Sequence, residues 1–460
     1  MKTFRRLIKF CRACAVGEGR LFVTGMARVP WAAALAMLVC SSSSSFAQDA
    51  LASLMQGSSS SGLAAQSTAN LPYNIKYGDF KLLARLTLEA DWNDNLNGAT
   101  SGGQHDYIIQ PTLNLKGTYP VTPANILTLS TEIGYAEYLE HPVYNGLRIN
   151  AGSQISFDMF IKDVHLNFHD SIQESQDTAS QGAVAGTAFY GGLNNTAGVL
   201  GTWNLGKLLF GLGFDERIYV SSTSLFDYGN YTSENPVARA GYKFSPYLTG
   251  GLEATASFLD YEDAVLNNSK SYNMGVYAQW KPDAYFQVSL HGGYTIYDFG
   301  QTSESTNVFR ESPGIGSSGP ASGVIRTSDL STWYAGATIT HQITKAISYG
   351  VSLTHEVLPG IQSDASEVTH VGPTASWAIT DHLTLHSAVN YEHGQQGLGN
   401  VTGNVSETYD WVNGSLSADY AMMTTLMLGL SYRRSIRYSN LEGASYAQDL
   451  ISLRLTYSPK

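Results

Sequence analysis

The sequence predicts an all-β fold: a transmembrane, antiparallel, up-and-down β-barrel of about eighteen strands, within a range of sixteen to twenty. Three observations predict it. Strand-length segments alternate apolar with small or polar residues, short and long connections alternate between the segments, and aromatic residues gather at the strand ends. In the segment 208–215, leucine and phenylalanine fill every even position, while Gly211, Gly213 and Asp215 share the opposite face. Neighbouring side chains in a strand point to opposite faces, so each such segment has one apolar and one polar side.

The composition excludes a helical membrane protein. The chain has 460 residues, of which only 14% are charged, with 45 glycines and 28 tyrosines, and its mean hydropathy is −0.12. The sequence contains no run of about 18 apolar residues that would span a bilayer as a helix. Composition alone leaves a large β-sandwich or a solenoid open, so the barrel rests on the pattern of the strands.

The first 47 residues are expected to be a signal peptide. Arg28 precedes an apolar run, 29–40, and the segment 45–47 fits the small-x-Ala pattern of a cleavage site. Met26 is an alternative start that would give a leader of ordinary length. Residues 48–78, rich in Ser, Ala and Gly, are expected to form a flexible periplasmic tail. The barrel is then expected over residues 79–460.

Cysteine and charge narrow the chemistry of the exported chain. Cys11, Cys14 and Cys40 all lie in the leader, so the C-x-x-C pair is not expected to act in the mature protein. The leader also carries seven of the 27 basic and one of the 38 acidic residues, which leaves a net charge of −17 on the rest. This balance argues against nucleic acid as a partner and favours cations in a pore. No cofactor or metal is predicted, because His165 and His169 lie about 13 Å apart along one strand.

The connections set the strand count and the orientation. Nine longer loops alternate with eight short turns, which gives about eighteen strands with both termini on the short-turn side, the periplasm. The longest loop, 300–328, is expected either to fold inward as a constriction or to remain outside.

The phase of each strand assigns its residues to the lumen or to the lipid. A charged lumen wall is predicted, with Arg85, Arg148, Arg217 and Arg239 as its expected basic side. The candidate pore-lining residues are Arg85, Glu89, Lys116, Glu132, Arg148, Asp215, Arg217, Arg239, Glu253, His291 and Arg433.

Aromatic residues on the lipid-facing phase are expected to form two girdles at the membrane surfaces, where amphipathic rings are favoured. The candidate girdle residues are Trp92, Trp203, Trp280, Trp377, Tyr135, Tyr294, Tyr391 and Tyr432.

The segment 88–95, with the sequence Leu-Glu-Ala-Asp-Trp-Asn-Asp-Asn, resembles the opening strand and Asp/Asn-rich turn of the porin-like β-barrel families of Gram-negative bacteria. The resemblance covers residues 75–457. It implies an outer-membrane barrel in contact with outer-membrane lipids and lipopolysaccharide, and some members of these families look associated with exopolysaccharide export. The last strand, 450–457, ends near an aromatic residue and looks like the signal that the barrel assembly machinery reads.

The function predicted from these observations is a passive outer-membrane channel for small hydrophilic solutes. Two alternatives remain: a barrel for exopolysaccharide export or a structural role at the cell surface, and an outer-membrane hydrolase. The chain is not expected to be an enzyme, because it contains no G-x-S-x-G or other recognisable nucleophile motif.

Overall fold

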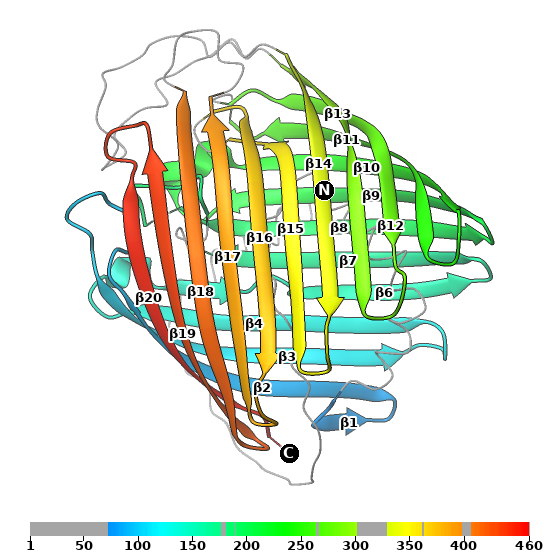
Figure 1. Ribbon diagram of the computed structural model, residues 1–460. Helices are drawn as coiled ribbons and strands as arrows, with labels where there is room; N and C mark the ends of the chain where they lie inside the picture. Colours follow the sequence, from blue (N-terminus) through cyan, green and yellow to red (C-terminus); the bar gives the residue numbers. More distant parts are fainter. Residues whose placement is uncertain are drawn as a thin grey trace. The chain divides into compact units, whose positions relative to one another are not determined.

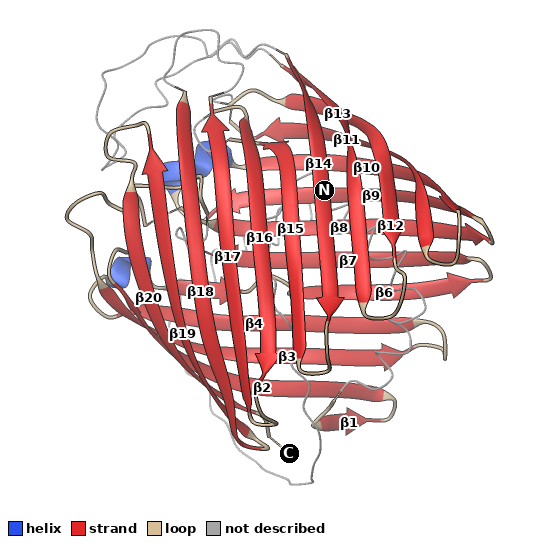
Figure 2. Cartoon of the chain, in the orientation of Figure 1, coloured by secondary structure: helices blue, strands red, loops and turns tan. Residues whose placement is uncertain are grey.

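The computed structural model describes residues 72–175, 181–188, 190–263, 266–300, 329–360, 363–397 and 406–459. All of them belong to one compact unit. Figure 2 shows that this unit is built almost entirely of strands. The expected leader, 1–47, and the loop segment 301–328 lie outside the described residues. Within the described part of the chain, no helix is long and apolar enough to cross a membrane.

The strands form one closed antiparallel sheet in which each strand pairs with its neighbours in sequence (Figure 1). The last strand returns to pair with β2, and β5 and β6 together occupy one place in the ring. The barrel therefore has eighteen strands, which confirms the predicted fold. The barrel strands are β2 Phe80–Asn93, β3 Asp106–Pro120, β4 Ile126–Tyr138, β5 Gly146–Ile149, β6 Gln154–Ile161, β7 Val164–Ser175, β8 Gly192–Leu205, β9 Leu208–Ser221, β10 Tyr231–Lys243, β11 Leu248–Tyr261, β12 Ser269–Trp280, β13 Phe286–Phe299, β14 Leu330–Gln342, β15 Ile347–Leu358, β16 Ser366–Ala378, β17 Leu383–Gln396, β18 Glu407–Met423, β19 Leu426–Ser439 and β20 Tyr446–Tyr457.

Tight turns join the strands at one end of the barrel and longer loops join them at the other, as the sequence predicts. Three of the turns have only two residues between barrel strands, and two of these three use a residue with positive φ: Gly206 at 74° and Lys162 at 55°. Such backbone conformations match the twist of a hairpin. Among the described residues, the loop end carries the short 3-10 helices η1 Pro142–Tyr144 and η3 Ser224–Gly229.

The ring closes through a ladder that leaves part of β2 uncovered. β20 pairs with β2 from Tyr457 opposite Leu86 to Leu450 opposite Asn93, so the first residues of β2 have no partner from β20. A short strand, β1 Ile75–Tyr77, pairs with that free edge, and the side chain of Asn74 bonds the backbone of Ala84. An uncovered edge is a template for unwanted pairing, which β1 and Asn74 limit. The end of the segment expected to be a flexible tail is thus ordered; residues 48–71 lie outside the described part.

The two faces of the wall differ as the strand phase predicts. On β2, Leu86 and Leu88 are exposed on the outer face, while Thr87 and Asp91 are buried on the inner face. The same alternation holds on the other strands; on β13, Leu290, Tyr294 and Ile296 are exposed. Buried side chains therefore gather inside the barrel, and many of them are polar or charged.

Candidate functional site

A buried network of charged and aromatic side chains lies on the inner wall over five consecutive strands. At its centre, Glu253 of β11 pairs with Arg239 of β10, with 3.0 Å between Oε2 and Nη2. The hydroxyl of Tyr334 on β14 donates to Glu253 Oε1 at 3.2 Å, and His291 Nδ1 on β13 lies 3.3 Å from the same oxygen. The guanidinium carbon of Arg239 lies 3.9 Å from the ring centre of Tyr277 on β12, within reach of a cation–π interaction. These five residues are called the wall network below.

Glycines let the side chains of this network lie flat against the wall. A Cβ at Gly336 would come 1.9 Å from His291 Nε2, and one at Gly275 would come 2.3 Å from the Tyr334 hydroxyl. Only a residue without a side chain leaves room for these rings at those two positions. The sequence predicted Arg239, Glu253 and His291 as pore-lining residues without showing that they meet.

The structure places the other candidate pore-lining residues on the inner face in smaller groups. Asp215 Oδ1 lies 3.1 Å from His169 Nε2, and Arg217 Nε donates to the hydroxyl of Thr196. Glu89 stands directly opposite Arg454 in the ladder that closes the barrel. The residues that remain partly accessible from the inside are Arg85, Lys116, Glu132, Arg148 and Arg433.

A segment of the β7–β8 loop reaches across the loop end of the barrel. This segment, residues 181–188, is called the strap. Its backbone bonds Gly98 of the β2–β3 loop, where Gly186 N donates to Gly98 O at 3.1 Å. On the far side, Gln396 Nε2 of β17 donates to Ala183 O at 3.0 Å, and Arg437 Nε of β19 donates to Gly182 O at 2.7 Å.

Arg437 fixes the far end of the strap. Its side chain is 1% exposed, and besides the bond to the strap it pairs with Glu407 at 2.7 Å and donates to Ala444 O at 2.6 Å. Its guanidinium carbon lies 4.4 Å from the ring centre of Tyr409. Because buried charges are stable only when paired and hydrogen-bonded, this arrangement holds the strap in one place.

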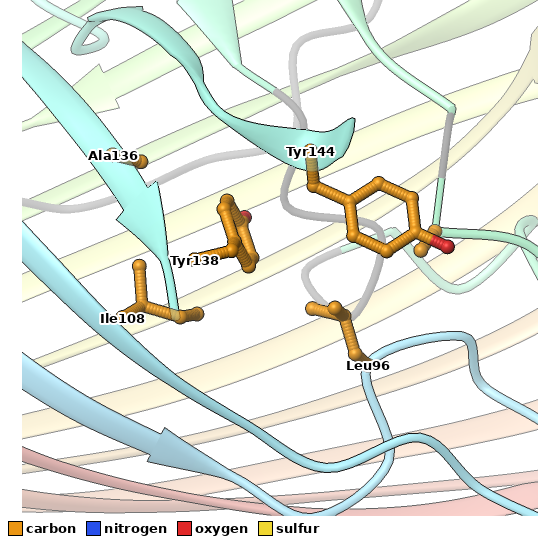
Figure 3. Packing of buried hydrophobic residues seen from close by; sticks show 6 residues of the cluster. Leu96, Ile108, Ala136, Tyr138 and Tyr144 are labelled. Carbon is orange, nitrogen blue, oxygen red and sulfur yellow. The ribbon is translucent and has the colours of Figure 1, made fainter. Parts of the chain in front are cut away.

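Apolar contacts seat the strap on both sides. Ala183 and Ala185 pack on the buried rings of Tyr409, Trp411 and Tyr446. Ala188 belongs to a second buried cluster formed by the neighbouring strands and loops. Figure 3 shows this cluster, in which Tyr138 and Tyr144 meet edge to face; its labelled members are Leu96, Ile108, Ala136, Tyr138 and Tyr144. Burial raises the pKa of Tyr144, because desolvation disfavours the charged phenolate.

The strap must have a glycine at its contact with the wall. A Cβ at Gly182 would lie 2.4 Å from Glu392 Oε1 and 3.2 Å from Trp411 Cβ. Glu392 is itself held by the hydroxyl of Tyr409 at 2.7 Å. The small residues of the strap therefore allow its backbone to approach the inner wall closely.

Further loops interlock at the same end. Asn267 in the β11–β12 loop bonds both carboxylate oxygens of Asp364 in the β15–β16 loop, at 2.8 Å each. Gly397 N in turn donates to Ser363 Oγ. These contacts tie the loops together at this end, whereas inner-face residues nearer the turns, such as Thr338 and Thr340, are exposed.

The candidate girdle residues lie on the outer face. Seven of the eight are exposed by 40–52%, and Trp92 is half-buried. Trp333, which the sequence reasoning did not name, is exposed in the same way by 53%. Their contact with membrane headgroups stays a prediction.

Sequence reasoning missed the strap and its anchor. The loop was recognised, but its inward course was not, and the constriction was sought instead in the segment 300–328, nearly all of which lies outside the described residues. One signal was available: Tyr409, Trp411 and Arg437 lie on the lumen phase, where aromatic residues are unexpected in a water-filled wall. Among the described residues, no group of three or more His, Cys, Asp or Glu is placed to hold a metal ion.

The comparisons with known proteins give structural likenesses only. No family model matches the chain, and no curated protein matches it. Among solved structures, Pseudomonas aeruginosa OccK2 (OpdF) in complex with glucuronate is 10% identical with a TM-score of 0.45, covering 82% of this chain and 98% of that one. The outer membrane protein opdK of Pseudomonas aeruginosa is 8% identical (TM-score 0.42; 82% and 99% covered), and Acinetobacter baumannii OccAB3 is 8% identical (TM-score 0.43; 83% and 100% covered). Likenesses of this size do not assign a function to this chain.

Proposed function

We propose that this protein is an outer-membrane channel through which small hydrophilic solutes diffuse passively. The observation that carries the proposal is the division of the wall into two faces. Its outer face exposes an apolar band that water does not favour, and its inner face carries buried and half-buried charges. A closed barrel satisfies all its backbone groups internally, which is the condition for crossing hydrocarbon with strands.

The inner surface supports a narrow passage rather than an open bore. An eighteen-strand ring is wide enough to leave an aqueous channel when nothing fills it. Here the strap and the interlocked loops take up part of the loop end, and the wall network lines the inside. The strap is proposed to set the largest solute that passes. The acidic balance of the chain favours cations over anions of the same size.

Planar-bilayer recording of the purified protein tests the proposal. We expect discrete current steps in KCl and a reversal potential on the cation-selective side in a salt gradient. Liposome swelling with sugars of increasing size gives the size limit. A folded, heat-modifiable protein that inserts into bilayers but passes neither ions nor sugars would contradict the channel function. Hydrolysis of lipid or peptide by the same preparation would favour an enzyme instead.

A further inference from the structure

The strands β14 and β15 are paired along only part of their length. Their ladder runs from Gln342 opposite Ser348 to Ala335 opposite His355 and ends there. The flanking ladders continue farther: β13 pairs with β14 up to Leu330, and β15 pairs with β16 up to Leu358. The described residues 330–334 and 356–358 therefore border a seam in the wall that no strand pairing joins.

Side chains hold the outer side of this seam together. The indole of Trp333 stacks on the imidazole of His355, with 3.7 Å between ring centroids. His355 Nε2 lies 3.1 Å from Glu367 Oε1 on β16. The hydroxyl of Thr332, which lies on the inner phase of β14 opposite Thr295, donates to the same oxygen at 3.1 Å. Polar clusters also lie on the outer face of β17–β18, where Asp410 bonds Tyr391 and His393, and of β19–β20, where Asp449 pairs with Arg434. The cluster at the seam differs from them because it bridges a gap in the backbone ladder.

The inner side of the seam is closed in the same way. The hydroxyl of Tyr297 on β13 donates to the backbone carbonyl of Val357 on β15 at 2.9 Å. Phe299, Val357 and Ala365 form a small buried cluster there, with Tyr297 and Leu330 packed against it. Separating the two strands at this level breaks no strand pairing, whereas separating fully paired neighbours breaks the backbone hydrogen bonds of their ladder.

Polar groups also connect the seam to the wall network. Tyr334 is part of the unpaired end of β14, and its hydroxyl donates to Glu253 in the network. On the facing edge, Glu356 is buried. Hydrogen-bonding groups therefore run from the inner wall, along both edges of the seam, to Glu367 outside. The carboxylates among them accept hydrogen bonds from hydroxyl groups.

We propose that the seam between β14 and β15 is a lateral exit from the channel to the membrane for amphipathic solutes with an uncharged, hydroxyl-rich head and a short alkyl tail. The head exchanges hydrogen bonds along the polar track while the tail enters the lipid. A purely hydrophilic solute gains nothing from this route, because lipid has no partners for it. This proposal rests on the proposed channel function.

A cross-link across the seam tests the lateral exit. In the chain without its leader, which has no cysteine, Thr332→Cys and Leu358→Cys are joined by a bis-maleimide. Single-channel block by hexyl glucoside is then compared before and after cross-linking, with glucose as the solute without a tail. We expect the blocks by hexyl glucoside to lengthen about tenfold, as for the loss of a dominant exit route, and those by glucose to stay unchanged.

The matched control is Thr338→Cys with Ser352→Cys, a pair inside the intact part of the same ladder, whose cross-link should leave both blocks unchanged. If hexyl glucoside blocks the channel for equal times with and without the cross-link between residues 332 and 358, the lateral exit is overturned and the proposed channel function still holds. If the wild-type protein passes no current, the proposed channel function is wrong. Photolabelling with a photoreactive hexyl glucoside then tests whether this solute enters the seam. Labelling of residues 330–334 or 356–358 supports the exit, and labelling confined to other segments overturns it.

Discussion

Replacing Arg437 by methionine should release the strap and widen the channel. Arg437 Nε bonds Gly182 O at 2.7 Å, and a hydrogen bond from a charged group contributes about 1.5–3 kcal/mol. Losing that bond alone changes the ratio of released to seated strap by about 10- to 100-fold. The substitution also removes the charged partner of Glu407, which lowers the stability of the barrel by about 3–5 kcal/mol but acts equally on the seated and the released strap, because both residues belong to the wall.

Single-channel recording measures the effect. We expect Arg437→Met to show larger or more frequent open levels than the wild type, and Arg437→Lys, which keeps the charge but not the fork of donors, to lie between them. The control is Arg434→Met on the same strand, where the side chain is exposed on the outer face and pairs with Asp449. Equal conductance and open probability in Arg437→Met and the wild type, with heat-modifiable folding retained, would refute the reasoning.

Three further predictions test the strap, the wall network and the outer face. Gly182→Val should raise the conductance as Arg437→Met does, because the valine side chain would meet Glu392 and Trp411. Gly414→Val should leave the conductance unchanged, because an added Cβ there would have no atom within 4 Å. An unchanged sugar-size limit of Gly182→Val in liposome swelling would count against the strap as the constriction. Glu253→Gln should move the reversal potential toward anion selectivity, because Arg239 loses its counter-charge. Glu137→Gln, on the exposed outer face, should leave the reversal potential unchanged. An unchanged reversal potential in Glu253→Gln would exclude the wall network from the solute path. Leu430→Arg should lower the stability of the protein in bilayers by about 2–4 kcal/mol, as for a charge near the midplane, and Ser431→Arg on the inner face should cost less; equal stabilities in urea unfolding would argue against a lipid-facing Leu430.

The sequence predicts the wall well because lipid and water impose a strict period of two. Leu86 and Leu88 on β2, or Leu290 and Ile296 on β13, face outward in the phase that their apolar character predicts. The strand count followed from the alternation of turns and loops, since a hairpin of two to five residues is recognisable from its glycine and polar residues. The last strand is longer than predicted and begins at Tyr446, because its ladder with β19 continues to Tyr446 opposite Arg437.

The candidate site is less predictable because its contacts join residues that are distant in sequence. Parity places Arg239, Glu253 and His291 on the inner face, but only the register of four ladders brings them together over β10–β14. The strap is harder still: Gly182 and Arg437 are 255 residues apart in the chain. Nothing in a Gly- and Ala-rich loop indicates whether it folds inward or outward, because small residues are equally suited to a close approach and to an exposed turn.

The aromatic residues of the inner face connect the predictable wall with the less predictable candidate site. On the outer face, aromatic residues are favoured by the membrane surface, so their positions follow the strand ends. Tyr277, Tyr334 and Tyr409 lie on the inner face, where contact with water does not favour aromatic rings. Each of them lies against a charged residue: Arg239, Glu253 and Arg437, respectively. A tyrosine in that position removes water from an ion pair while leaving one hydroxyl to bond it, which strengthens the pair and fixes its direction. At these three positions a tyrosine on the lumen phase therefore marks a charge held in place, in the wall network and at the anchor of the strap, whereas Tyr219, Tyr231 and Tyr261 pack on one another.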